Sequence, residues 1–333
     1  LTEQDRFDID LPLSYYLPYL RPSNKRTKIT REILAHQAQF QPWIPFYWKT
    51  RVEDELDPMI YSTSKKDGFN TMVARNLYIM DNYRDSIFDT IVSSELLEKR
   101  EYKYSDIGFY LLCDALEKVT KKPFDQYVFE NYYAPMGLTT MGYKPLDRLD
   151  KARVVPTELD TSFRGQLIQG YVHDPGAAML GGVSGHAGLF SNASDMATLM
   201  QMYLQGGSYG GRQYLKPETL EEFTRQQFPL DENRRAIGFD KPYPEYDSLG
   251  PVCRSASLRS YGHSGFTGTY TWADPDNGLL YVFLSNRVYP DANNYKLLKM
   301  DLRTDLHQLV YDILEKQRPV HLPARKNQLL KNN

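Results

Sequence analysis

A glycine-dense stretch near the end of the chain brings several reactive residue types together. Residues 261–269 read YGHSGFTGT, so the imidazole of His263 stands beside the hydroxyl of Ser264 and the flexible Gly265. Glycines let a ligand approach the backbone closely. An exposed strand backbone at this place can also pair with an extended, peptide-like substrate. The stretch is therefore a candidate substrate site.

The residues that follow predict a hairpin that positions this site. Residues 270–272 favour a strand, DPDNG at 274–278 is a strong turn signal, and 279–284 is an apolar run of strand length. We therefore expect His263 on or beside a strand at the edge of a sheet. A final amphipathic helix is predicted over 297–314.

A second candidate group stands just ahead of a predicted helix. Tyr104, Ser105 and Asp106 precede apolar residues that recur at helical spacing over 109–119. A tyrosine can carry a proton, but its pKa lies near 10, so a neighbouring cation must favour the phenolate. Asp106 either faces a ligand or caps the helix that begins at Ile107. The sequence leaves both roles open.

In chain order, these groups resemble the signature boxes of the serine β-lactamase and penicillin-binding protein superfamily. His263-Ser264-Gly265 is similar to the third box, Lys-Thr-Gly or His-Thr/Ser-Gly, and residues 104–106 are similar to the second box, Tyr-x-Asn, with Asp in place of Asn. The first box, Ser-x-x-Lys, is expected upstream of Leu1. Residues 173–191 resemble a Bacteroidetes subgroup whose members are often fused behind a glycoside hydrolase family-three domain that acts on N-acetylhexosaminides.

The resemblance implies an α/β (α+β) fold of the β-lactamase/transpeptidase type, with an antiparallel sheet flanked by helices and a mainly helical lobe. We expect one domain over residues 1–316, with the helical lobe over about 25–175 and the α/β lobe over about 176–316. Residues 317–333 are expected to form a basic tail. Family strands that would pair beside residues 279–285 are expected upstream, and the open edge left without them could mediate self-association.

The reaction that the resemblance implies is acyl transfer through a serine ester, on a D-Ala amide of the peptidoglycan type or on an ester. Tyr104 would act as general base toward the serine and as general acid toward the leaving group. His263 would bind a substrate carboxylate, hydrogen-bond Tyr104 or, when protonated, favour its phenolate. The backbone N–H of Phe266 would form half of an oxyanion hole.

Substrate contacts are also expected from other residues. Asp106, Ser264, Gly265 and Phe266 belong to the two boxes. Trp43, in the aromatic segment 41–48, either forms a wall of the substrate cleft or packs on the core. An ionised Asp106 only accepts hydrogen bonds and would repel the carboxylate of a penicillin. This favours an esterase or peptidase over a β-lactam hydrolase.

Two further serine patterns are weaker candidates. Residues 62–65, STSK, fit Ser-x-x-Lys, but Lys66, Asp67 and Gly68 follow where a buried apolar helix is needed. Residues 262–266 resemble a nucleophile elbow, but Phe266 stands where Gly-x-Ser-x-Gly requires glycine. Neither Ser62 nor Ser264 is therefore the expected nucleophile.

Composition narrows the choice of partners. The formal net charge of −2 disfavours nucleic acid, and no apolar run is long enough to span a membrane. The two cysteines and six histidines show no metal-ligand spacing, and no cofactor is implied. We expect a small-molecule or cell-wall peptide substrate, a possible upstream glycosidase domain and, by resemblance, a periplasmic or secreted location. The competing interpretation is a non-catalytic accessory module that binds peptidoglycan.

Overall fold

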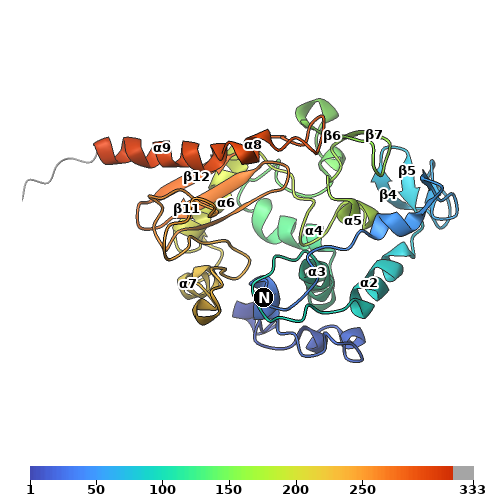
Figure 1. Cartoon of the computed structure of the whole chain (residues 1–333), viewed down its shortest axis with the longest axis horizontal. Helices are drawn as coiled ribbons and strands as arrows, with labels where there is room; N and C mark the ends of the chain where they lie inside the picture. The colour runs from blue at the N-terminus through green and yellow to red at the C-terminus, as the bar shows by residue number, and fades with distance from the viewer. Residues whose placement is uncertain (318–333) are drawn as a thin grey trace, which may run out of the picture.

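The computed structural model describes residues 1–317, which form a sheet-containing part and a mainly helical part (Figure 1). In Figure 1 the strands β11 and β12 lie on the left with α6 and α9, and α2, α3 and α5 lie to the right with the small sheet of β4 and β5. The expected basic tail lies outside the described residues from position 318 onward.

The helices follow the apolar spacing of the sequence. The predicted helix over 109–119 is α3, and it ends where Lys121 adopts a left-handed conformation, two residues before Pro123. The α-helices are α1 (Thr30–Leu34), α2 (Tyr83–Ser93), α3 (Ile107–Thr120), α4 (Phe124–Val128), α5 (Pro175–Met179), α6 (Ala193–Leu204), α7 (Pro217–Thr224), α8 (Lys296–Lys299) and α9 (Leu302–Gln317).

The strands form five small antiparallel sheets. The largest two have three strands each, in the orders β10-β11-β12 and β3-β5-β4. The strands are β1 (Arg51–Val52), β2 (Glu55–Leu56), β3 (Tyr61–Ser62), β4 (Thr71–Ala74), β5 (Leu77–Ile79), β6 (Pro156–Asp160), β7 (Gln166–Gln169), β8 (Ser208–Tyr209), β9 (Arg212–Gln213), β10 (Tyr261–Ser264), β11 (Tyr270–Asp274) and β12 (Leu279–Phe283).

The predicted hairpin is confirmed. β11 pairs with β12 across the turn after Asp274, and β10 pairs with the other side of β11, with His263 opposite Thr271. A Cβ atom at Gly262 would lie 2.4 Å from a ring carbon of Trp272, so only glycine lets β10 approach β11 this closely.

Helices cover both faces of this sheet. On one face, Met200 of α6 packs with Tyr261 and Ala273. On the other face, His307 of α9 stacks on Tyr281 with ring centroids 4.4 Å apart. This part of the molecule thus has three layers, with α6 on one face of the sheet and α9 on the other.

One predicted helix needs correction. The helix predicted over 297–314 is divided into α8 and α9, because Asp301 adopts a left-handed conformation with φ of 47°. In α1, Ile29 holds the N-cap position without a side-chain bond, and Thr30 lies in the first turn.

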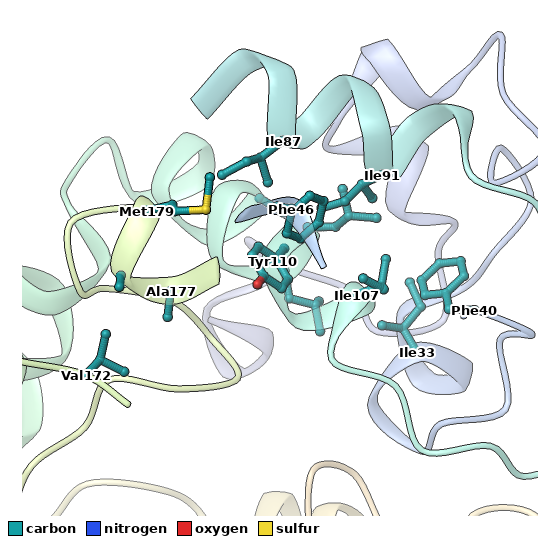
Figure 2. Packing of buried hydrophobic residues seen from close by; sticks show 14 of the residues in the cluster. Ile33, Phe40, Phe46, Ile87, Ile91, Ile107, Tyr110, Val172, Ala177 and Met179 are labelled. Carbon is teal, nitrogen blue, oxygen red and sulfur yellow. The ribbon is translucent and has the colours of Figure 1, made fainter. Parts of the chain in front are cut away.

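The main hydrophobic core lies in the helical part. Figure 2 shows Tyr110 of α3 at its centre, with Ile87 and Ile91 of α2 and Ala177 of α5 around it. All four side chains are at most 2% exposed, so the core fixes the N-terminal end of α3 in place. No helix within residues 1–317 is long and apolar enough to cross a membrane.

Candidate active site

Tyr104 is held at the entrance to α3 by the residue after it. Ser105 is buried, and its backbone N–H donates to Nδ1 of His36 at 3.1 Å. Its hydroxyl donates to the carbonyl of Gln41 at 2.6 Å and accepts from the N–H of Ile107 at 3.2 Å. Ser105 therefore caps the start of α3 and fixes the backbone on which Tyr104 is carried.

Asp106 occupies the N-cap position of α3, but its side chain makes no capping hydrogen bond. The capping role considered for it is therefore wrong, and Ser105 performs it. Burial raises the pKa of the Asp106 carboxyl to about 6; nearby His186 opposes the increase and Asp174 adds to it. Its backbone N–H donates to the carbonyl of Pro42 at 3.1 Å.

His263 lies on β10 and meets Tyr104 across the site. The two ring centroids are 6.1 Å apart, although the residues come from distant parts of the sequence. Nδ1 of His263 lies 2.8 Å from the carbonyl oxygen of Ser264, so this nitrogen carries the proton of the neutral ring. Burial and, to a smaller extent, Arg235 lower the pKa of His263 to about 4, although Asp240 opposes the decrease. His263 is therefore neutral near pH 7 and does not supply a cation to Tyr104 there.

Tyr104 itself stays protonated at neutral pH. It is 43% exposed, and one side of its ring lies against His36 with centroids 4.3 Å apart. The loss of surrounding water and, to a smaller extent, Asp106 raise the pKa of its hydroxyl to about 12, although Arg235 opposes the increase. In these surroundings Tyr104 is suited to donate a proton.

The loop after β10 shapes the other side of the site. Ser264 is exposed, and Gly265 uses its N–H to donate to the carbonyl of Thr269 at 2.8 Å. The N–H of Phe266 has no backbone acceptor among residues 1–317 and so remains available to a ligand. The Phe266 ring is stacked on His173, with centroids 5.0 Å apart.

The backbone next to Trp43 is hydrogen-bonded to the start of α3. Its neighbour Pro42 accepts the hydrogen bond from Asp106, and the Trp43 side chain is 42% exposed. Its ring lies edge-on to Trp48, with centroids 6.1 Å apart. Whether Trp43 contacts substrate stays a prediction.

Three side chains near Asp106, those of Asp174, His186 and Ser184, are joined in a row by hydrogen bonds. Nε2 of His186 bonds Oδ1 of Asp174, and its Nδ1 bonds Oγ of Ser184, each at 2.9 Å. Ser184 is only 1% exposed, so a substrate does not reach its hydroxyl. These residues therefore hold the glycine-rich segment against α5. No cluster of metal-binding side chains exists among residues 1–317.

Ser62 lies in β3 and not at the start of a helix. Its hydroxyl donates to the carbonyl of Ser64 at 2.7 Å. A surface hollow of about 570 Å³ lies nearby, lined by residues including Met59, Lys66 and Asp81, and neither Tyr104 nor His263 borders it. Within residues 1–317, no hydrogen bond or shared hollow joins Ser62 to Tyr104 or His263.

Comparison with known proteins decides the family. The family model described as "Beta-lactamase" matches residues 1–302. This chain belongs to the β-lactamase family. The β-lactamase-like α/β fold predicted from the sequence, with antiparallel strands and flanking helices, is thereby confirmed.

Two curated proteins that are similar in sequence to this chain carry the same name, "Putative D-alanyl-D-alanine carboxypeptidase". The protein from Escherichia coli K12 is 37% identical over 233 residues, which cover 66% of this chain and 52% of that protein. The protein from Salmonella gallinarum is 36% identical over 219 residues, which cover 61% of this chain and 49% of that protein. The chain spans about half the length of these relatives.

Solved structures show the same β-lactamase-like fold at low sequence identity. Simvastatin synthase (LovD) from Aspergillus terreus has a TM-score of 0.61 at 16% identity, covering 94% of this chain and 79% of that chain. A β-lactamase from Sulfitobacter sp. EE-36 has a TM-score of 0.60 at 18% identity, covering 95% of this chain and 79% of that chain. At this low identity the matches show the fold alone.

Two residues of this β-lactamase-family site were not predicted from the sequence. His36 follows the end of α1 and was not among the candidate site residues. Arg235 belongs to no recognisable box, yet its guanidinium carbon lies 5.8 Å from the centre of the Tyr104 ring. Only the fold brings Arg235 to this place.

Proposed function

We propose that this chain is the β-lactamase-family part of a serine hydrolase that transfers an acyl group through a serine ester. The observation that carries the proposal is the meeting of Tyr104 and His263, whose ring centroids are 6.1 Å apart. The substrate class is a D-Ala amide of the peptidoglycan type or an ester. The name of the curated relatives supports the first of these, and the carboxyl group of Asp106 at the site supports the second.

In the proposed reaction, the serine oxygen bonds to the carbonyl carbon of the substrate and passes its proton to the lysine of the Ser-x-x-Lys box that the resemblance places upstream. The bond from that carbon to the amine or alcohol breaks, Tyr104 gives the leaving group a proton, and the proton on the lysine then restores the Tyr104 hydroxyl. Water then attacks the ester, which releases the acid and regenerates the serine hydroxyl. The N–H of Phe266, which has no backbone acceptor within residues 1–317, serves the developing oxyanion.

The Asp106 carboxyl separates the substrate candidates. Its pKa of about 6 leaves it ionised at pH 7.5, when it offers no donor to a substrate carbonyl. We expect slow reaction with penicillins, whose own carboxylate is repelled. An uncharged ester is the substrate least affected by this charge.

The test compares residues 1–333 with a polypeptide extended by the coding sequence upstream of Leu1, where the resemblance places Ser-x-x-Lys. Intact-mass spectrometry after treatment with a fluorophosphonate and with a fluorescent penicillin measures covalent labelling. We expect the extended form to gain one fluorophosphonate adduct, which a Ser→Ala change in that box abolishes, and residues 1–333 to gain none. Labelling of residues 1–333 that disappears in Ser62→Ala would instead make Ser62 the nucleophile.

The competing function is a non-catalytic module that binds peptidoglycan. Failure of the extended form to label, together with retained binding to isolated peptidoglycan, would establish that function and exclude the hydrolase. For either function we propose a periplasmic or secreted location and an upstream N-acetylhexosaminidase domain. Cell fractionation and the sequence of the intact gene test these two proposals.

A further inference from the structure

Arg235 is a buried charge that its own surroundings do not balance. The residue is 1% exposed, and its Nε and Nη2 atoms have no hydrogen-bond partner within residues 1–317. Its nearest carboxylate oxygen is Oδ2 of Asp240, 3.5 Å from Nη1. Because a buried charge without partners is costly, such a residue needs an explanation.

Asp240 is already occupied by another arginine. Nε of Arg234 lies 2.7 Å from Oδ1 of Asp240, and Nη2 of Arg234 donates to Oδ2 at 3.0 Å. Two guanidinium groups therefore share one carboxylate. Among residues 1–317, one positive charge of this cluster has no carboxylate of its own, and the longer distance assigns it to Arg235.

The uncompensated charge lies beside the reactive rings. The guanidinium carbon of Arg235 is 5.8 Å from the centre of the Tyr104 ring. Tyr104 contacts His36 on one side and faces His263 at 6.1 Å. Since Arg235 is buried, a substrate does not touch it, and its effect on chemistry passes through these rings.

We propose that Arg235 is the positioning cation of this site, which makes the ionised form of the neighbouring Tyr104 less costly and adds to the effect of burial in disfavouring a second proton on His263. This inference rests on the proposed function, because the protons that it positions are those of the proposed acyl transfer. Arginine suits the role because a guanidinium stays charged when buried, whereas a buried lysine readily loses its proton.

The hydrogen bonds specify where the remaining protons are. Nδ1 of neutral His263 donates to the Ser264 carbonyl, so its Nε2 is the free acceptor. Nδ1 of His36 accepts from the N–H of Ser105, so its Nε2 carries the proton. Arg235 opposes a second proton on both rings, and the pKa of His36 lies well below its ordinary value, chiefly through burial and then through Arg235.

Other charged groups act on the same two rings. Asp106, Tyr102 and Asp240 raise the pKa of Tyr104, and Arg235 lowers it. For His263, Arg234 acts in the same direction as Arg235, and Asp240 acts against both. Removing Arg235 and removing Asp240 should therefore move the titration of His263 in opposite directions, which a purely structural role of either residue does not predict.

The experiment is an NMR titration of the histidine rings in residues 1–333. The chain has six histidines, and His263→Gln assigns the signal of interest. In the unchanged protein we expect His263 to titrate near pH 4. In Arg235→Gln its pKa should rise by about one unit, the lower end of the effect of a nearby charge. In Asp240→Asn it should fall.

Arg259→Gln is the matched control, because Arg259 is exposed and pairs with Asp276 at the surface. It should leave His263 unchanged. An unchanged His263 in Arg235→Gln, or a His263 that titrates near 6.5 in the unchanged protein, would overturn the inference. If Arg235→Gln does not fold, the pKa of His263 in the unchanged protein and in Asp240→Asn still tests the inference.

The titration requires no catalysis, so the two proposals can fail separately. The expected shift in a polypeptide whose extended form takes no label would retain Arg235 as the cation and exclude the hydrolase. Labelling of the extended form together with an unmoved His263 would do the reverse.

Discussion

Two titratable residues at the start of α3 have raised pKa values, with different consequences at neutral pH. The pKa of Tyr104 is raised to about 12, so the hydroxyl keeps its proton. The pKa of Asp106 is raised to about 6, so the carboxyl has lost its proton at pH 7.5 although burial opposes this. The sequence showed that Asp106 stands in place of Asn. The fold adds that ionising this carboxyl lowers the stability of the folded protein, because the group is buried.

The cost of ionising Asp106 is measurable as stability. Its folded pKa of about 6 lies above the ordinary 3.8, so between these values the folded protein binds more protons than the unfolded chain. Stability should therefore fall as pH rises through this window. We expect Asp106→Asn to be more stable than the unchanged protein by about 1–2 kcal/mol at pH 8, and nearly equal to it at pH 4. Urea unfolding at both pH values measures the difference.

Asp67→Asn is the matched control for this prediction, since Asp67 is exposed and bonds to no side chain within residues 1–317. It should be neutral at both pH values. An Asp106→Asn variant that is equally stable with the unchanged protein at pH 8 would contradict the raised pKa.

At the scale of elements, one carboxylate holds α5 and the glycine-rich segment together. Oδ1 of Asp174 accepts from the N–H of Ala177 at 2.7 Å and from Nε2 of His186 at 2.9 Å. Burial opposes its ionisation, but these hydrogen bonds hold the pKa of Asp174 below its ordinary value. Its contribution to stability is thus present above pH 4 and is lost as pH falls through the folded pKa.

We expect Asp174→Ala to lower the free energy of unfolding by about 2–4 kcal/mol at pH 7, because it removes a cap and leaves His186 without its partner. Asp174→Asn keeps an acceptor and should lose less. Asp150→Ala is the matched control, since exposed Asp150 caps a short 3-10 helix through Ala152, and it should cost about 1 kcal/mol or less. Equal losses in Asp174→Ala and Asp150→Ala would show that the His186 bond adds nothing.

The elements that the sequence predicted well are those with local signals. The apolar spacing of α3 and the turn before Gly278 lie within a few residues, so the helix and the hairpin could be foreseen. The division at Asp301 could not, because a left-handed aspartate leaves no clear pattern. Arg235 could not either, because its role depends on contacts with residues far away in the chain.

At the scale of the molecule, the two edges of the β10-β11-β12 sheet differ. A bridge between Asp240 and Gly262 covers the β10 edge. Within residues 1–317, β12 pairs only with β11, so no strand of this part of the chain covers its outer edge. All five residues of β12 are half-buried, and the formal net charge of −2 gives little repulsion between copies.

An open, apolar edge with weak charge repulsion is a site for pairing between chains. We therefore expect residues 1–333 to associate reversibly as their concentration rises, and Val282→Lys, which adds a charge to β12, to reduce this association. Sedimentation velocity over a concentration series measures it, and near-UV circular dichroism checks that the variant is folded. Val155→Lys, at an exposed position outside this sheet, is the control and should associate like the unchanged protein. A stable monomer at every concentration would show that the edge is protected in some other way and would contradict the prediction.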